Sequence, residues 1–210
     1  MGGRFLTIAL LCLLGMGLGT AYTWVNAQND QAGSLASLEP AAGVAGGADI
    51  GGSFTLTDQN GNTLSSSDID KYKLVFFGFT YCPDVCPAGL QKMTQAMEAL
   101  DKGDAAKIQP VFITIDPARD TPEVMQVYLK SYHDSFIGLT GSEEDIDAVE
   151  KQYKVYAARM DDESAPDGYS MNHSSFIFLM GPNDDLISLF SSTDSPAEIV
   201  RDIKNALSHS

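Results

Sequence analysis

Two long apolar runs constrain the fold of this chain more than any other feature. The segments KLVFFGFT (residues 73–80) and IQPVFITI (residues 108–115) are apolar and aromatic apart from a few polar positions. Strands of this composition are buried on both faces, as in a parallel sheet that helices cover. Between the two runs, residues 87–100 repeat apolar side chains at helical spacing. We therefore expect a layered α/β domain with both runs in its central sheet.

The segments before and after these runs extend the alternation of strands and helices. Alternating residues around Asn60-Gly61 in FTLTDQNGNTLSS predict a β-hairpin at the start of the domain. Further along, we expect a helix starting at residues 120–123, a helix at 143–154, strands on both sides of the turn at 182–185, and a last helix opened by Ser195-Pro196. This order resembles a three-layer thioredoxin-like fold with an added amino-terminal β-hairpin, and we assign it to residues 51–208.

An uncharged stretch near the amino terminus predicts a membrane anchor. Residues 5–25 contain no charged side chain, and this length is enough to cross a hydrocarbon core of roughly 30 Å. Arg4 precedes the stretch, and the next basic residue is Lys71. This asymmetry predicts a single-pass transmembrane helix with residues 1–4 in the cytoplasm and the following domain outside, which in a bacterium means the inner membrane and the periplasm. The alternative is a cleaved signal peptide, with Val25-Asn26-Ala27 as the cleavage region.

The segment between the expected anchor and the domain has the composition of a linker. Residues 26–50 are rich in Gly, Ala and Ser and have no sustained period, so we expect a flexible linker.

The formal net charge of the whole chain is -15, with a pI of about 4.3. An acidic protein is repelled by a phosphate backbone, so nucleic acid is not expected as a partner.

The segment GFTYCPDVCPAGLQ (residues 78–91) places Cys82 and Cys86 between a buried strand and a helix. The pair could form a structural disulfide, a redox couple or a metal site. A disulfide closing about five residues stabilises by only about 2 kcal/mol, which argues against a purely structural role. The amino terminus of a helix favours a thiolate. Because Pro87 disfavours helical geometry at the preceding residue, we expect the helix to begin at Pro87, with Cys86 at its cap and Cys82 in the turn before it.

One of the three histidines is a candidate to join the cysteines. His209 lies in the carboxyl-terminal tail, and His133 follows an amphipathic helix, where a cation suits the helix dipole. His173 instead lies in a polar loop just before the apolar segment SFIFLM. Strand ends and the loops beside them converge on one site in an α/β sheet, which could bring His173 to the two cysteines.

Three motifs together resemble the Sco/SenC family of copper proteins, which help to assemble cytochrome c oxidase. They are TYCPDVCP at residues 80–87, DPARDTP at 116–122 and MNHS at 171–174, in the family's order. The resemblance implies a thioredoxin-like domain that binds copper through Cys82, Cys86 and His173. It also implies a role in delivering copper to the dinuclear CuA centre of oxidase subunit II, or in reducing the cysteines of that centre, with other copper chaperones or thiol reductants as further partners.

The donor set is chemically consistent with copper. Two thiolates and one imidazole suit Cu(I), and the imidazole also permits Cu(II). Oxidation of Cys82 and Cys86 to a disulfide would abolish the site, so redox state and copper loading are coupled. Asp116, at the end of the second apolar run, is a candidate to orient His173, to tune the thiolates or to contact a partner, unless it only caps the turn before Pro117.

Other classes of function remain open from the sequence. A thiol-disulfide oxidoreductase without a metal role fits two thiols at a strand-to-helix junction, although the usual couple has two intervening residues rather than three. A peroxidase would activate one cysteine with a nearby Thr and Arg; Thr80 is present, but the sequence assigns no Arg to the site. A binding module with an acidic face is the third alternative. We favour a metallochaperone over an enzyme.

Overall fold

The computed structural model describes residues 50–209 of the chain. The expected cytoplasmic end (1–4), the transmembrane anchor (5–25) and all but the last residue of the expected linker (26–50) lie outside this range. Among residues 50–209, no helix has the length and apolar character needed to cross a membrane.

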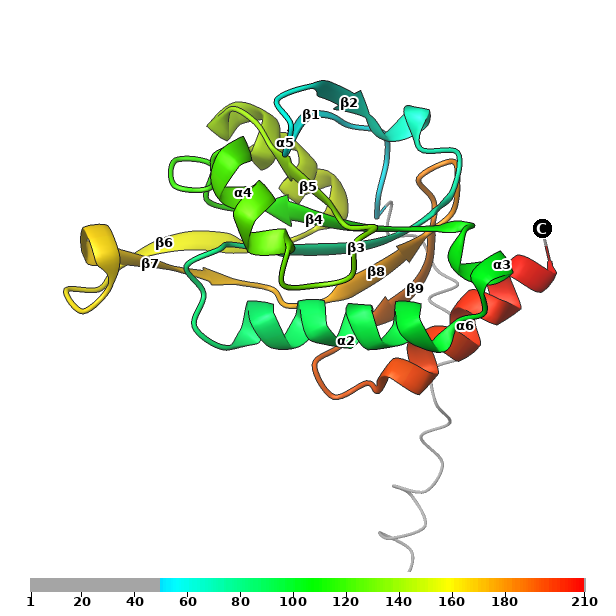
Figure 1. Ribbon diagram of the computed structural model, residues 1–210. Coiled ribbons are helices and arrows are strands. Elements are labelled where there is room, and N and C mark those ends of the chain that lie inside the picture. Colours follow the sequence, from blue (N-terminus) through cyan, green and yellow to red (C-terminus); the bar gives the residue numbers. More distant parts are fainter. Residues whose placement is uncertain (1–49, 210) are drawn as a thin grey trace, which may run out of the picture. The chain divides into compact units, whose positions relative to one another are not determined.

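A seven-stranded mixed sheet forms the centre of the domain, in the order β2-β1-β5-β4-β3-β8-β9 (Figure 1). β3 pairs in parallel with β4, and β4 pairs in parallel with β5. The other neighbouring strands, β1–β2, β1–β5, β3–β8 and β8–β9, pair antiparallel. All of β4 and all but the first residue of β3 are buried, which confirms the prediction from the two apolar runs. The strands are β1 (Thr55–Asp58), β2 (Thr63–Ser65), β3 (Tyr72–Gly78), β4 (Ile108–Thr114), β5 (Ile137–Thr140), β8 (Ile177–Met180) and β9 (Leu186–Phe190).

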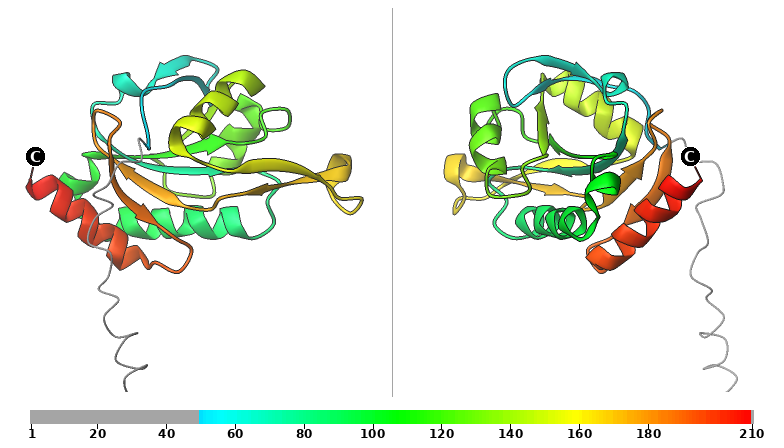
Figure 2. Two further views of the ribbon diagram at one scale, coloured as in Figure 1. Left: turned by 180° about the vertical axis from the view of Figure 1, so that it is seen from behind. Right: turned by 45° about the vertical axis from the view of Figure 1, so that its right-hand side comes forward.

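Helices cover both faces of this sheet, as the three-layer prediction requires (Figures 1 and 2). The adjacent residues Phe76 and Phe77 of β3 point to opposite faces. Phe76 packs at Gly89 of α2, whereas the Phe77 ring lies 5.2 Å from that of Tyr153 in α5. α6 contacts α2 on the first face. The helices are α2 (Val85–Ala99), α3 (Lys102–Ala105), α4 (Pro122–Leu129), α5 (Glu143–Tyr153) and α6 (Pro196–Ser208), with 3-10 turns η1 (Ser66–Asp68) and η2 (Pro166–Gly168).

The predicted amino-terminal hairpin is present as β1 and β2. Thr57 pairs with Thr63, and the loop between the strands places Gly61 at φ +82°, a left-handed conformation that favours glycine. β1 also pairs with β5, so the hairpin extends the central sheet.

A buried ion pair joins β3 to the β8–β9 turn. The Nζ atom of Lys73 lies 2.9 Å from Asp184 Oδ1, and the two side chains are 0% and 3% exposed. Lys73 also donates to the carbonyl oxygens of Gly181 and Pro182, at 3.3 and 3.0 Å. The Ser66 hydroxyl donates to Asp184 Oδ2 at 2.6 Å. Each buried charge is therefore paired and hydrogen-bonded, which offsets the free-energy cost of removing it from water.

A separate two-stranded sheet carries the histidine of interest. In the described part of the chain, β6 (Ala157–Asp161) and β7 (Tyr169–His173) pair only with each other, and they extend beyond the central sheet (Figures 1 and 2). The sequence analysis predicted neither this hairpin nor β5. It placed His173 in a loop, which is wrong: His173 is the last residue of β7 and pairs with Ala157.

Candidate metal site

The two cysteines lie where the chain turns from β3 into α2. The helix begins at Val85 with Asp84 at its N-cap, so Cys86 is the second helical residue. Our prediction of a helix start at Pro87 was therefore wrong by two residues. Pro87 is tolerated at the third position because the first four N–H groups of a helix have no intrahelical acceptor in any case.

Both thiols are largely withdrawn from solvent. Cys82 is 9% exposed and Cys86 is 0% exposed. The backbone N–H of Cys86 donates to Cys82 Sγ at 3.4 Å, and the N–H of Cys82 donates to the carbonyl of Phe79 at 3.2 Å. A Cβ atom at Gly78 would lie 2.7 Å from Cys86 Sγ, which is closer than real Cβ contacts. The absence of a side chain at Gly78 therefore makes room for the Cys86 thiol against β3.

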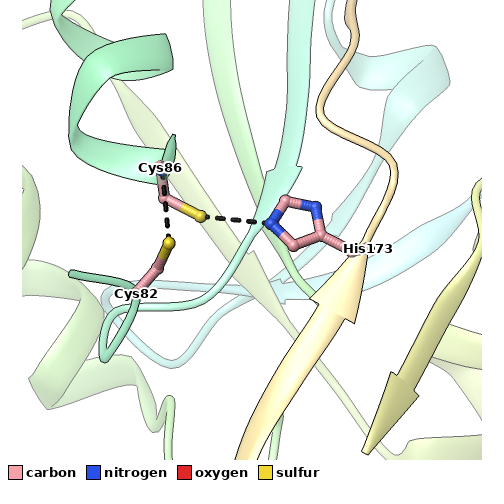
Figure 3. Close-up of side chains that lie close together, drawn as sticks. All are labelled: Cys82, Cys86 and His173. Atoms are coloured by element: carbon pink, nitrogen blue, oxygen red, sulfur yellow. Dashed lines mark hydrogen bonds between the residues drawn. The ribbon is translucent and has the colours of Figure 1, made fainter. Parts of the chain in front are cut away.

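His173 faces the cysteines from the end of β7 (Figure 3). Its Nε2 atom lies 3.4 Å from Cys86 Sγ, and its Nδ1 atom lies 2.8 Å from the carbonyl oxygen of Ser174. Because a carbonyl oxygen can only accept, Nδ1 carries the proton and the lone pair of Nε2 points to the thiols. The rings of Phe76 and Phe79 meet the imidazole edge to face, at 6.3 and 6.0 Å, and fix its plane.

The three side chains form a compact donor set. Cys82 Sγ, Cys86 Sγ and a ring nitrogen of His173 all lie within 4.8 Å of one another. Metal-to-ligand distances of about 2.0–2.3 Å place ligand atoms roughly 3.5–4.5 Å apart, so small side-chain movements would suffice to hold an ion. The other histidines of the described region lie elsewhere: Nδ1 of His133 contacts the Ser135 hydroxyl, and Nδ1 of His209 contacts the Asn205 carbonyl.

Comparison with protein families decides the classification. The family model described as SCO1/SenC matches residues 42–208. The chain belongs to the SCO1/SenC family. This confirms the resemblance drawn from the three sequence motifs.

Individual Sco proteins are similar to this chain in sequence and in fold. A SCO2-like protein of Rickettsia felis is 46% identical over 156 residues, which are 74% of this chain and 76% of the relative. The structure of Bradyrhizobium japonicum ScoI with copper bound is 38% identical, with a TM-score of 0.67 over 74% of this chain and 98% of that one. BsSco, a member of the Sco family of cytochrome c oxidase assembly proteins with a disulfide switch, has the same fold at 24% identity, with a TM-score of 0.59 over 73% of this chain and 91% of that one.

The two thiols of this Sco/SenC domain differ in acidity. The pKa of Cys82 is lowered to about 4, chiefly because the Cys86 thiol donates a hydrogen bond to it, although burial opposes the shift. The pKa of Cys86 is raised because its proton is held in that hydrogen bond and because the group is buried. The reduced, metal-free site therefore holds one thiolate and one thiol, and a metal that binds both sulfurs must displace one proton.

Asp116 is hydrogen-bonded to Tyr169 and Arg119 rather than to the imidazole of His173. Its Oδ1 atom accepts from the Tyr169 hydroxyl at 3.0 Å, and its Oδ2 atom accepts from Arg119 Nε at 2.5 Å. The Nδ1 atom of His173 donates to Ser174 rather than to this carboxylate. Through Tyr169, Asp116 contacts the hairpin that carries His173. These contacts fit an indirect influence of Asp116 on the imidazole.

A second buried carboxylate supports the cysteine loop, and the sequence analysis treated it only as part of a helix start. Asp120 is 0% exposed and accepts hydrogen bonds from the Thr80 N–H, the Thr80 hydroxyl and the Thr114 hydroxyl, at 3.0, 2.5 and 2.6 Å. Thr121 is the actual N-cap of α4. Asp120 therefore fixes the backbone two residues before Cys82, and its pKa is raised by burial.

Proposed function

We propose that this protein is a copper metallochaperone that binds copper through Cys82, Cys86 and His173 and assists assembly of the CuA centre of cytochrome c oxidase subunit II. The observation that carries the proposal is the convergence of the three ligand atoms within 4.8 Å, from segments far apart in the sequence. The copper-bound structure of a ScoI relative and the assignment of BsSco to the oxidase assembly proteins support it.

The donor set favours copper as the cargo. The two sulfurs are soft ligands that select Cu(I), and the imidazole extends the set to Cu(II). A structural zinc site would require a fourth protein ligand. The three-ligand cluster of the described region contains no other Cys, His, Asp or Glu. A three-ligand site leaves room for a ligand from a receiving protein, which suits transfer better than a closed cage.

The second candidate is a thiol-disulfide oxidoreductase that reduces the CuA cysteines or other exported thiols. Two features favour it: Cys82 and Cys86 lie beside each other, with the Cys86 N–H donating to Cys82 Sγ at 3.4 Å, and the lowered pKa of Cys82 provides a thiolate for attack on a disulfide. In such a reaction Cys82 would form a mixed disulfide with the substrate, and Cys86 would displace the substrate thiol. This leaves a Cys82–Cys86 disulfide, which an external thiol reductant must reduce.

Transfer and reduction can be separated with the same purified proteins. Equal amounts of the Cu(I)-loaded and the Cu(II)-loaded chain are mixed with the reduced, metal-free CuA domain of subunit II, and the absorption of the mixed-valence CuA centre is followed. The reduced, metal-free chain is mixed with the same domain in its disulfide form, and free thiols are counted. We expect His173→Ala to lose transfer and to keep reduction, because only the metal site needs the imidazole. Formation of the CuA centre at an undiminished rate with His173→Ala would contradict the metallochaperone role.

We further propose that residues 5–25 anchor the protein in the bacterial inner membrane, with the domain in the periplasm. The uncharged stretch and the Arg4–Lys71 asymmetry support this location. Digestion of intact spheroplasts with protease should remove the domain and leave a membrane-bound fragment. A domain protected until the membrane is lysed would contradict the proposed orientation.

A further inference from the structure

The hairpin that carries His173 is not held by the central sheet. Within residues 50–209, β6 and β7 pair only with each other, so no ladder of backbone hydrogen bonds in that range fixes their position relative to β3 and α2. The distance between His173 and the cysteines therefore depends on the segments that flank the hairpin and on side-chain contacts with the rest of the domain.

One group of these contacts is centred on Tyr169, the first residue of β7. The guanidinium groups of Arg119 and Arg159 both lie over the Tyr169 ring, at 3.7 and 3.6 Å from its centre. Arg119 Nη1 also donates to the carbonyl oxygen of Tyr169 at 3.1 Å. The Tyr169 hydroxyl donates to Asp116, which is itself paired with Arg119. Stacking and hydrogen bonds thus hold this tyrosine in one orientation.

Arg119 also contacts the segment that carries the cysteines. Its guanidinium lies 4.8 Å from the centre of the Tyr81 ring, and Tyr81 directly precedes Cys82. The Arg119 side chain is only 7% exposed, although the Tyr81 residue that it contacts is 47% exposed. Arg159, in contrast, belongs to β6 and is itself part of the hairpin. Arg119 therefore links the two ligand-bearing parts of the site from a third segment.

We propose that Arg119 is a positioning residue that holds the His173 hairpin against the cysteine loop and thereby sets how tightly the site binds Cu(II) relative to Cu(I). This inference rests on the proposed copper-binding function. Two soft thiolates retain Cu(I) without much help from the imidazole, whereas Cu(II) depends on the nitrogen ligand. Loosening the hairpin should therefore weaken Cu(II) binding selectively.

The test compares Arg119→Lys with wild type in the full-length chain. Lysine keeps the charge but loses the planar group that stacks and donates along two directions. Dissociation constants for Cu(I) and Cu(II) are measured by competition with chromophoric chelators. We expect the Cu(II) constant to rise about 10- to 100-fold, as for other residues that orient a metal ligand, with a much smaller change for Cu(I). Arg201→Lys, an exposed arginine of α6 paired with Asp202, is the matched control and should change neither constant.

A double mutant separates positioning from a general loss of structure. If Arg119 acts through His173, Arg119→Lys should have no further effect on Cu(II) binding in the His173→Ala background. Equal weakening of Cu(I) and Cu(II), or a Cu(II) effect that persists without the imidazole, would overturn the proposal.

Hydrogen exchange of the metal-free protein provides a readout that does not need copper. Arg119→Lys should accelerate exchange of the β6 and β7 amides while leaving those of β3 and β4 unchanged. Unchanged exchange in β7 would show that Arg119 does not hold the hairpin. If the wild-type protein binds neither Cu(I) nor Cu(II), the proposed function fails, and so does the proposed effect of Arg119 on copper affinity. The exchange result still decides whether Arg119 positions the hairpin.

Discussion

The Sγ atom of Cys86 lies 3.4 Å from the Nε2 atom of His173, although the two residues are 87 positions apart in the chain. One belongs to the first turn of α2, and the other ends a hairpin that the central sheet does not include. The site therefore exists only in the folded domain, and its geometry depends on two segments that can be perturbed separately.

The thiol asymmetry can be tested by alkylation of the reduced, metal-free protein. At about pH 6, where an ordinary thiol is almost wholly protonated, iodoacetamide should modify Cys82 before Cys86, because Cys82 is the thiolate and is the less buried of the two. Cys86→Ala removes the hydrogen-bond donor and should shift the onset of Cys82 alkylation to higher pH. Mass spectrometry identifies the modified residue. Initial modification of Cys86, or an unchanged onset in the variant, would refute this assignment.

Gly78→Ala should disturb the metal site as well as the fold. The added methyl group would lie 2.7 Å from Cys86 Sγ and must displace it. We expect a loss of about 1–3 kcal/mol in the free energy of unfolding and weaker binding of copper in both oxidation states. Gly138→Ala is the matched control, because its methyl group would meet Leu129 and Met125 at 2.6 and 2.9 Å, away from the site. Equal copper affinities in the two variants would show that the space at Gly78 is not needed for the site.

Lys73→Met should destabilise the domain strongly. It leaves Asp184 buried without its cation, which costs about 3–5 kcal/mol in comparable buried pairs. Urea denaturation measures the change. Lys151→Met, which removes an exposed pair with Asp147, should have little measurable effect. Similar midpoints for the two variants would mean that the Lys73–Asp184 pair contributes no more than a surface pair.

The half-buried Glu150 should make stability depend on pH. Its pKa is raised from 4.5 to about 7, mainly by burial, so the folded state favours the protonated carboxyl. This contribution is fully present below pH 4.5 and is lost as the pH rises through about 7. The free energy of unfolding of Glu150→Gln should therefore increase relative to wild type across that interval. Glu144→Gln, an exposed position on the same helix, is the control. A constant difference between Glu150→Gln and wild type would be inconsistent with the raised pKa.

The central sheet and its layers could be predicted because their signals are local. β3 and β4 are continuous apolar runs, α5 and α6 begin with capping boxes at Ser142 and Ser195, and the β1–β2 turn contains Asn-Gly. The start of α2 was predicted less accurately, because the local preference of Pro87 for the first helical position is weaker than the packing that places Cys86 inside the helix. Tertiary contacts overrode it.

The surroundings of the site could not be predicted in the same way. Cysteine spacing and the histidine motif identify Cys82, Cys86 and His173, but β6 and β7 mix polar and apolar residues and only Tyr169 in them is buried, so they lack the pattern of a buried strand. The stacking of Arg119 on Tyr169 and Tyr81 joins three segments that no sequence period connects. The role of Gly78 is likewise visible only once Cys86 is placed beside it.

Copper binding by the reduced protein tests the central claim most directly. The full-length chain, purified without oxygen, is compared with Cys82→Ser, Cys86→Ser and His173→Ala for copper stoichiometry and for affinity in both oxidation states. We expect one copper ion per chain, with Cu(I) and Cu(II) binding lost or severely weakened in both cysteine variants. Removal of His173 should weaken both states and affect Cu(II) most. Absence of copper binding in wild type, or equal affinity for Cu(II) without His173, would contradict the proposed site.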